Sequence, residues 1–413
     1  MACYGQKEAP ARASPQGGGA VAPGGGGPGG RAPGAAGAGT TASPGAAPMA
    51  VAGVSPGDWE IFRRLTCTEL TPEERAAAAA PDMTDPEEAC CFAPHFHPEW
   101  VPADLVGERL ARAFPAARES FAVPTQHNVI ASLGPWSGVE ADVWSKKCGM
   151  KIQLLVHARA GRLEGSSAFR GMVERTFRYR ELQLLEILEL AARPDPGAEA
   201  ELAKSGFAAP ELERAASHLS SLKAMIDASG IASGPGAAML KNRLATDFIE
   251  SKERGTDPAG LDRLLSLVNL LKARVKSRPD PARFHEAEEF IEEARGAGAG
   301  IVVPHPPRFW PALLAELDAD GWEVWNPSTP SHAVFLTECL ARRGRIRRPL
   351  LAFMGDDTHM SSKIRPLLTS DKGGGGREIG FQPPWKDPET AAALKAAGQS
   401  RRRTMEEYLA RLA

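Results

Sequence analysis

Two pairs of side chains that can bind metals, each pair separated by one residue, stand far apart in the chain. The first pair is His95 and His97, and the second is Asp357 and His359. Alternate side chains of a β-strand point to the same side, so each pair can offer two donors to one ion. Imidazoles combined with a few carboxylates suit Zn²⁺, Mn²⁺ or Fe²⁺. The spacing therefore predicts a metal site if the two strands meet in space.

Four more potential ligands stand at or near the ends of predicted strands: His127, Glu140, His157 and His305. A barrel of parallel strands gathers the C-terminal ends of its strands into one pocket. Two or three ions in such a pocket can hold a hydroxide nucleophile and stabilise the departing oxygen of a phosphate ester. Arg308, three residues after His305, could form two parallel hydrogen bonds from its guanidinium group to a phosphate.

Each of these signals has a plainer explanation when taken alone. A single His-x-His pair is often a chance surface pair, a lone buried histidine is usually a packing residue, and an arginine after a strand is often only solvated. Together, however, six of the nine histidines stand at such positions. The combination favours a metal site.

The elements that must position these residues alternate between strand and helix, which indicates an α/β chain. The predicted strands are Cys90–His97, Phe121–His127, Gly138–Val143, Lys151–Ala158, Gly300–His305, Trp322–Trp325 and Leu350–Met354. Between the fourth and fifth strands, residues 166–280 are rich in helical patterns. The predicted helices there are Glu181–Ala192, Glu211–Ala228, Leu240–Glu253 and Gly260–Lys276. We expect this segment to be a helical insertion within a domain of residues 57–413.

Composition sets limits on the remainder of the chain. Residues 1–56 are almost entirely Gly, Ala, Pro and Ser, which predicts a disordered N-terminus. The net charge of −2 suggests neither a nucleic acid nor an anionic membrane as partner. No apolar run is long enough for a membrane span, and the start is a poor secretory signal. The six cysteines show no CxxC spacing, so we expect a reducing, cytoplasmic location.

The order of the motifs resembles the polymerase and histidinol phosphatase (PHP) superfamily of metal-dependent phosphoesterases. The resemblance covers about residues 91–160 and 283–362. It rests on His95-x-His97, Thr125–Asn128, Gly138–Glu140, His157, His305-Pro306, Glu323–Asn326 and Asp357-x-His359. It implies a distorted seven-stranded (β/α) barrel with two or three metal ions. The ligands that it implies are His95, His97, His127, Glu140, His157, His305, Asp357 and His359, with Glu140 as the bridging carboxylate.

The chain departs from the family's pattern at three places. Ala93 stands where the family usually has Asp, Gln126 replaces the Asp of a Thr-Asp-His motif, and no Ser-Asp-Gly follows the His-x-His pair. Carboxylates of this kind orient histidine ligands and raise their basicity. Glu99 and Asp104 are the two nearby candidates to replace them.

We therefore expect a metal-dependent hydrolase that acts on a small-molecule phosphate ester and uses Mn, Zn or Fe. His305 or His359 would serve as general acid, and Arg308 would contact the phosphate. Two alternatives stay open at this point. The pocket could hydrolyse a non-phosphate bond such as an amide, or the chain could be a non-catalytic metal-binding or regulatory module. The sequence indicates no oligomeric state.

Overall fold

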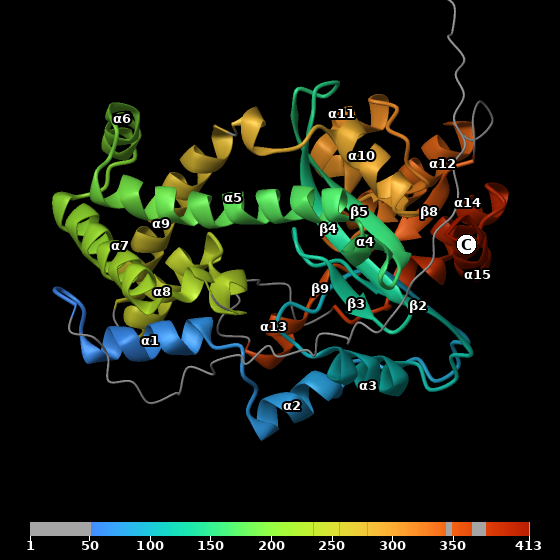
Figure 1. Ribbon diagram of the computed structural model, residues 1–413, viewed down its shortest axis with the longest axis horizontal. Coiled ribbons are helices and arrows are strands. Elements are labelled where there is room, and N and C mark those ends of the chain that lie inside the picture. The colour runs from blue at the N-terminus through green and yellow to red at the C-terminus, as the bar shows by residue number, and fades with distance from the viewer. Residues whose placement is uncertain are drawn as a thin grey trace, which may run out of the picture. The chain divides into compact units, whose positions relative to one another are not determined.

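The computed structural model describes residues 51–233, 235–255, 257–278, 280–343, 349–365 and 377–412 (Figure 1). Most of the predicted disordered N-terminus, residues 1–56, lies outside these ranges. The first described helix, α1 (Pro56–Thr66), begins with a capping box in which Ser55 and Asp58 satisfy each other's backbone N–H groups. All the described residues belong to one compact unit.

The strands form two hydrogen-bonded sheets. The smaller sheet has the order β2-β1-β9, and the larger has the order β3-β4-β5-β6-β7-β8. Neighbouring strands are parallel except in the pairs β3–β4, β4–β5 and β5–β6, which are antiparallel. The strands are β1 (Cys90–His97), β2 (Glu119–Pro124), β3 (Ala131–Leu133), β4 (Trp136–Ser145), β5 (Met150–Arg159), β6 (Gly300–Val303), β7 (Gly321–Trp325), β8 (Leu351–Met354) and β9 (Thr358–His359).

The two sheets are linked at both of their meeting edges by side-chain and loop hydrogen bonds. At one edge, the Gln382 amide nitrogen donates to the carbonyls of Phe92 on β1 and Met354 on β8, both at 2.8 Å. At the other edge, the Asn128 N–H donates to the Glu140 carbonyl at 2.7 Å. The prediction of an α/β fold is confirmed. The predicted seven-stranded barrel is not present as one continuous hydrogen-bonded ring, because the described strands divide into these two sheets.

Aromatic side chains fill the space between the two sheets. Phe92 of β1 lies 5.6 Å from both Phe121 of β2 and Phe353 of β8, measured between ring centroids. Tyr408, on the C-terminal helix α15 (Arg401–Arg411), packs edge-on against Phe121 and Phe353. This apolar layer lies beneath the ligand-type residues and holds their strands at fixed positions.

The outer faces of the sheets are covered by helices, whose apolar sides complete the core. These helices are α2 (Pro72–Ala79), α3 (Ala103–Ala113), α4 (Arg162–Gly165), α10 (Ala287–Gly296), α11 (Trp310–Leu314), α12 (Ala333–Arg343), α13 (Met360–Ile364) and α14 (Pro388–Ala396). Short 3₁₀ turns join several of them. The turns are η1 (Ile231–Ser233), η2 (Pro235–Met239), η3 (Pro281–Arg283), η4 (Pro306–Phe309), η5 (Pro330–His332) and η8 (Pro383–Trp385).

Along the chain, a group of helices follows β5 and precedes β6, where the sequence predicts a helical insertion (Figure 1). It comprises α5 (Ser167–Ala192), α6 (Pro196–Lys204), α7 (Ala209–Ser229), α8 (Arg243–Lys252) and α9 (Pro258–Ser277). The first half of α5 buries Phe169 and Met172 in the core of the larger sheet, and its second half buries Ile187 and Leu188 among the helices. One continuous helix thus joins the insertion to the sheets. Leu182, near the middle of this helix, is 49% exposed.

Among the helices of the described ranges, none combines the length and the apolar character that crossing a membrane requires.

Candidate metal centre

His95 and His97 lie side by side at the end of β1, where every residue of the strand is buried. A register shift between Ala93 and Phe96 alters the pairing with β2 just where the two histidines occur. Their Nε2 atoms are 3.2 Å apart. Two imidazole nitrogens that bind one Zn²⁺ at ~2.1 Å stand roughly 3.0–3.4 Å apart, so the spacing of this pair fits a shared ion.

The second pair of ligand-type residues reaches the first through the parallel pairing of β1 with β9. The Asp357 Oδ1 atom lies 3.2 Å from His97 Nε2, 3.7 Å from His95 Nε2 and 3.6 Å from His359 Nε2. The Asp357 N–H also donates to the His95 carbonyl at 3.0 Å. The structure therefore brings together the two pairs that are far apart in the sequence.

Glu140, on β4, is fully buried at the centre of the cluster. Its Oε1 lies 3.5 Å from His305 Nε2 and 3.8 Å from His95 Nε2. Its Oε2 contacts His127 Nδ1 and lies 3.8 Å from His97 Nε2. Apart from this contact with His127, neither oxygen has a hydrogen-bond partner. A buried carboxylate without hydrogen bonds is costly unless a positive charge compensates it, and two divalent ions on either side would do so.

Three overlapping groups of donors surround Glu140. In each group the ligand atoms lie within 4.8 Å of one another. The groups are His97-His127-His359, His95-His97-Asp357 and His95-His305-Glu323. His95 and His97 each belong to two of these groups, so ions held by different groups would share ligands. The donor set fits Zn²⁺, Mn²⁺ or Fe²⁺ by its chemistry.

Three of the imidazole rings are stacked. The His97 ring stacks on both His127 and His359, with ring centroids 4.3 Å and 4.2 Å away and interplanar angles of 19° and 23°, and the centroids of these two rings are 5.8 Å apart. His127 and His359 are partly exposed, with 28% and 26% of their side-chain surface accessible, whereas His97 is fully buried. The cluster therefore has a closed interior and one open side.

Burial and neighbouring charges divide the histidines into two kinds. Burial disfavours the charged form of His95, but Glu323 and two further carboxylates outweigh it and raise its pKa to about 10. Partial burial disfavours the charged form of His359 as well, yet Asp357 and Glu99 raise its pKa to about 9. Burial lowers the pKa of the other three: His97, His127 and His305. The neutral three are already in the form that binds metals, and an ion would displace protons from the other two.

Backbone strain gathers at the same place. Only five described residues other than glycine have a positive φ, and four of them are in or beside the cluster. These four are Glu99 (56°), Asn128 (52°), His305 (28°) and Asp357 (50°). Positive φ is unfavourable for residues with a Cβ, and such strain persists mainly at functional sites. The geometry supports a functional role for this end of the sheets.

A cavity of about 270 Å³ opens beside His127 and His359. Its floor comes from the cluster and from loops next to it, and its walls include residues of the helical insertion. The lining residues are Glu99, His127, Asn128, Asp142, Lys151, Gln153, Thr176, Tyr179, Arg180, Gln183, Lys241, Asn242, Arg243, Lys276, Phe284 and His359. A small molecule in this cavity would touch both the candidate metal centre and the insertion.

No protein-family model matches the chain, and no curated protein matches it. Among solved structures, it is similar to the crystal structure of a "putative metal-dependent phosphoesterase" from Bifidobacterium adolescentis. The TM-score is 0.44 and the sequence identity is 15%, and the alignment covers 76% of this chain and 98% of that chain. So distant a likeness transfers no activity, and the site is interpreted from its own residues.

His157 is the predicted ligand that the structure does not bring into the cluster. The prediction assumed parallel strands, but β5 runs antiparallel to β4 and β6, so its C-terminal end points away from the site. His157 is fully buried opposite Gly138, and its Nδ1 is 2.9 Å from the Tyr408 hydroxyl. Burial lowers its pKa to about 3. The strand's other end, with Gln153, faces the site instead: its Oε1 lies 2.8 Å from His305 Nε2.

Glu323 was recognised in a family-like motif but was not predicted to be part of the site. Its Oε1 lies 2.5 Å from His95 Nδ1, and its Oε2 accepts a hydrogen bond from the His305 N–H at 2.7 Å. It thus orients His95 from the side away from the cluster, which is the usual place of a carboxylate behind a histidine ligand. The signal in the sequence was a carboxylate inside the otherwise apolar strand Gly321–Trp325.

Of the two candidates for the missing carboxylates, Glu99 reaches the cluster and Asp104 does not. Glu99 is 3.6 Å from His359 Nδ1, accepts from the Ser361 N–H at 2.8 Å and pairs with Lys241 at 2.9 Å. Burial opposes its charge, but Lys241 and His359 hold its pKa well below the usual range. Asp104 is 69% exposed at its side chain and pairs with Arg75 at the surface.

Arg308 follows His305 in the turn η4, and its side chain is exposed. It does not line the cavity beside the cluster. Its charge contributes to the lowered pKa of His305, whose largest cause is burial. Arg308 is therefore near the site, while the cations that line the cavity come from other elements.

Proposed function

We propose that this chain is a metal-dependent hydrolase of phosphate esters, built on a distorted (β/α) barrel of the PHP type. The observation that carries this proposal is the buried Glu140 carboxylate, which has four imidazole nitrogens within 3.8 Å and, apart from its contact with His127, no hydrogen-bond partner. A cavity with several cations on its walls adjoins this cluster, which suits a substrate that carries negative charge. A cluster of metal ligands beside a positively charged cavity suits the hydrolysis of a phosphate ester.

The proposed ligands of two or three Mn, Zn or Fe ions are the predicted residues without His157. They are His95, His97, His127, Glu140, His305, Asp357 and His359. Glu140 is proposed as the bridging carboxylate because both of its oxygens face histidines. Glu323 and Glu99 lie behind His95 and His359 and would raise the basicity of these two ligands.

Bound ions of this kind lower the pKa of water and stabilise the charge that develops on phosphoryl oxygens. The chain's own residues position the ions and the substrate. The buried strand β1 keeps water from the inner side of the cluster, since His95 and His97 have no exposed surface. The exposed edges of His127 and His359 leave the substrate one direction of approach, through the cavity.

The general-acid role predicted for His305 or His359 competes with the ligand role, because a nitrogen that holds an ion cannot give up a proton. We propose the ligand role for both. His305 Nε2 and His359 Nε2 face Glu140 and Asp357 at 3.5 Å and 3.6 Å. Their Nδ1 atoms face Glu323 and Glu99 at 3.9 Å and 3.6 Å. The phosphate contact of Arg308 remains a prediction.

The test is to measure metal content and hydrolysis together on the full chain. The protein is loaded with Mn²⁺, Zn²⁺ or Fe²⁺, assayed on phosphomonoesters and phosphodiesters, stripped with a chelator, and assayed again after metal is restored. We expect activity that disappears and returns with the metal, and that is lost in Asp357→Asn. Asp104→Asn, a carboxylate change at the surface, is the matched control.

Other results would point to the alternatives. A metal-loaded chain that cleaves amides but no phosphoester would support the amide hydrolase. A chain that takes up no metal on reconstitution would favour the non-catalytic module. A metal-loaded chain without turnover on the whole phosphoester panel would exclude the proposed function.

A further inference from the structure

The walls of the cavity are unusually rich in cations. Five of its lining side chains are basic: Lys151, Arg180, Lys241, Arg243 and Lys276. Only two lining side chains are carboxylates, Glu99 and Asp142. Four of the five cations come from the segment between β5 and β6, whereas the predicted metal ligands come from the sheets and their loops. The insertion thus gives the cavity a positive wall of its own.

Three of these cations are paired with carboxylates. Lys151 lies 2.6 Å from Asp142, Lys241 lies 2.9 Å from Glu99, and Arg243 lies 3.2 Å from Asp247. Within the described part of the chain, Arg180 and Lys276 form no ion pair. The guanidinium of Arg180 makes one hydrogen bond, from Nη1 to the His127 carbonyl at 3.1 Å. Two positive charges therefore face the cavity without a carboxylate partner.

A donor on the same wall lacks a partner as well. Arg243 Nη2 is buried and makes no hydrogen bond. Burial lowers the pKa of Arg180 and Lys241, which are half-buried and hold their charge in a poorly solvated place, whereas Lys276 is exposed at the edge of the cavity. A bound anion would relieve this cost and would accept the unused donors.

The wall and the candidate metal centre border the same small volume. Arg180 bonds to the main chain of His127, and Lys241 reaches His359 through Glu99. At about 270 Å³ the cavity is at the small end of the range for ligand sites, so its occupant must be compact. A compact molecule in this volume touches the cluster at one end and the wall at the other.

We propose that the helical insertion forms a second anion subsite, with Arg180, Arg243 and Lys276 as its main contacts. The substrate would then be a small phosphate ester with another anionic group, a phosphate or a carboxylate, on the side away from the cluster. The position of the scissile ester in this proposal rests on the function proposed above. The existence of the subsite does not rest on that function, since anion binding can be measured without metal.

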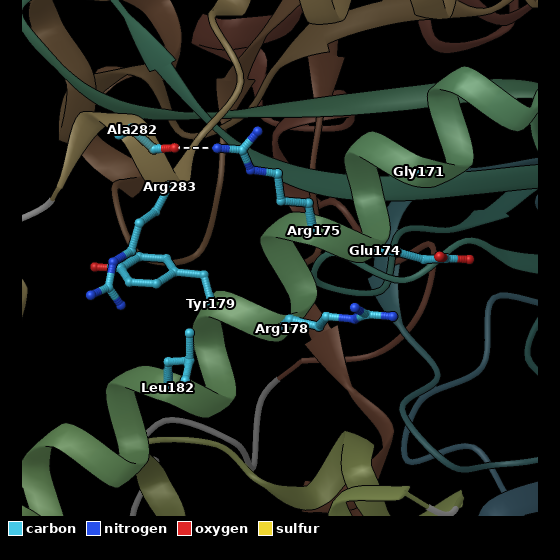
Figure 2. A pocket seen from close by; sticks show the side chains of 8 residues that line it. All are labelled: Gly171, Glu174, Arg175, Arg178, Tyr179, Leu182, Ala282 and Arg283. Atoms are coloured by element: carbon cyan, nitrogen blue, oxygen red, sulfur yellow. Dashed lines mark hydrogen bonds between the residues drawn. The ribbon is translucent and has the colours of Figure 1, made fainter.

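A second basic hollow, which Tyr179 also lines, serves as the internal comparison (Figure 2). It has a volume of about 380 Å³ and includes Arg175, Arg178 and Arg283. Arg175 donates to the Ala282 carbonyl, and Arg283 stacks on the Tyr179 ring at 4.9 Å. No residue of the candidate metal centre lines this hollow. Arg178 is exposed there, two residues before Arg180 on the same helix, and provides the matched control.

The first experiment measures binding of inorganic pyrophosphate to the metal-free full chain by calorimetry. We expect the double variant Arg180→Gln/Lys276→Gln to bind it at least ~10-fold more weakly, because each lost charged contact costs about that factor. Arg178→Gln should bind as the wild type does. Circular dichroism and the melting temperature show whether each variant is folded. If Arg178→Gln lost as much pyrophosphate affinity as the double variant, or if the double variant lost none, the subsite would be overturned.

The second experiment compares substrate pairs on the metal-loaded protein. Fructose 6-phosphate and fructose 1,6-bisphosphate differ by a phosphate, while glycerol 3-phosphate and 3-phosphoglycerate differ by a carboxylate. We expect kcat/KM to favour one of the doubly anionic partners by about 10-fold or more, and the double variant to reduce that ratio. The preferred pair identifies the second group.

The two proposals fail in different ways. Turnover of the singly and doubly anionic esters at equal kcat/KM, with the ratio unchanged in the double variant, would refute the subsite and leave the phosphoesterase standing. Absence of all turnover would refute the phosphoesterase, and the pyrophosphate measurement would then decide the subsite alone.

Discussion

His95 and Glu323 are held together by a 2.5 Å contact between Nδ1 and Oε1, and both side chains are fully buried. The two residues come from different sheets, on β1 and β7. The contact leaves His95 Nε2 facing the cluster and fixes the orientation of the ring. Glu323 thus supplies to the His-x-His pair a carboxylate of the kind that the sequence lacks at Ala93.

This relationship predicts the effect of Glu323→Gln. The amide keeps the size of the side chain but removes the charge that raises the basicity of His95. We expect the metal affinity to fall by ~10–100-fold, with little change in fold. Titration against a chromophoric chelator measures it. Asp104→Asn, which removes an exposed carboxylate, should leave the affinity unchanged, and an equal effect in both variants would count against the role of Glu323.

Gly355→Ala tests the same contact by a different route. A Cβ at Gly355 would overlap Glu323 Oε1 and come within 2.9 Å of His95 Nδ1. Because both side chains are buried and paired, neither can move aside at low cost. We expect this variant to lose metal affinity as Glu323→Gln does, and to lose ~1–3 kcal/mol in the free energy of unfolding as well. Gly107→Ala, where an added Cβ meets nothing within 4 Å, is the control.

The positions of the main site residues could be anticipated because strand spacing is a local property. The strand Cys90–His97 was predicted with the bounds that the structure has, and its His-x-His pair meets Asp357 as the alternation of side chains requires. The contact between Glu323 and His95 could not be predicted from strand spacing in the same way. It depends on how two sheets meet, and no local pattern encodes that.

The placement of His157 outside the donor groups has a signal in the sequence. Only residues 146–149 separate β4 from β5. A parallel crossover needs a dozen or more residues, so a connection this short requires an antiparallel hairpin. In this hairpin His157 lies opposite Gly138, whereas Gln153 lies opposite Asp142 and lines the cavity together with it. The positive wall of the cavity had no such signal, because Arg180 and Lys276 are brought together only by the packing of α5 and α9.

Alanine variants of His127 and His157 distinguish a metal ligand from a packing residue. His127→Ala should lower the number of metal ions bound per chain, since this ring contacts Glu140 and His97 at the open side of the cluster. His157→Ala should keep its metal and lose ~2–4 kcal/mol of stability, because the buried ring and its bond to Tyr408 are removed. Elemental analysis and urea unfolding check both. Loss of metal in His157→Ala would restore it to the ligand set.

Removal of metal should destabilise the native chain. Ions that bind only the folded state stabilise it by RT ln(1 + [L]/Kd), or ~2.7 kcal/mol at a hundredfold excess over Kd. Stripping the cluster also leaves the Glu140 carboxylate buried without hydrogen bonds. We expect chelation to lower the melting temperature by about 3–4 °C for each site emptied, and restored metal to reverse the change. The same chelator should lower the melting temperature of Asp357→Asn much less. An equal change in the two proteins would indicate ions bound elsewhere.

Asp247 predicts a pH dependence of stability in the helical insertion. Burial raises the pKa of its carboxyl to about 7, although Arg243 lies 3.2 Å away and acts in the opposite direction. The groups that face it are Arg243, Glu250 and Lys272. Between pH ~4 and ~7 the folded chain therefore holds a proton that the unfolded chain has released. The unfolding free energy must then fall as the pH rises through this range.

Asp247→Asn cannot ionise, so it should lack this part of the pH dependence. The other titrating groups are common to both proteins and cancel in the difference between them. Relative to the wild type, we expect the variant to gain ~1–3 kcal/mol in unfolding free energy between pH 4.5 and pH 8. Urea unfolding at several pH values measures this gain. Asp227→Asn, an exposed change on α7, should follow the wild type at every pH. If the difference between wild type and Asp247→Asn stayed constant with pH, the carboxyl would not be protonated in the folded chain, and its pair with Arg243 would be ionised throughout.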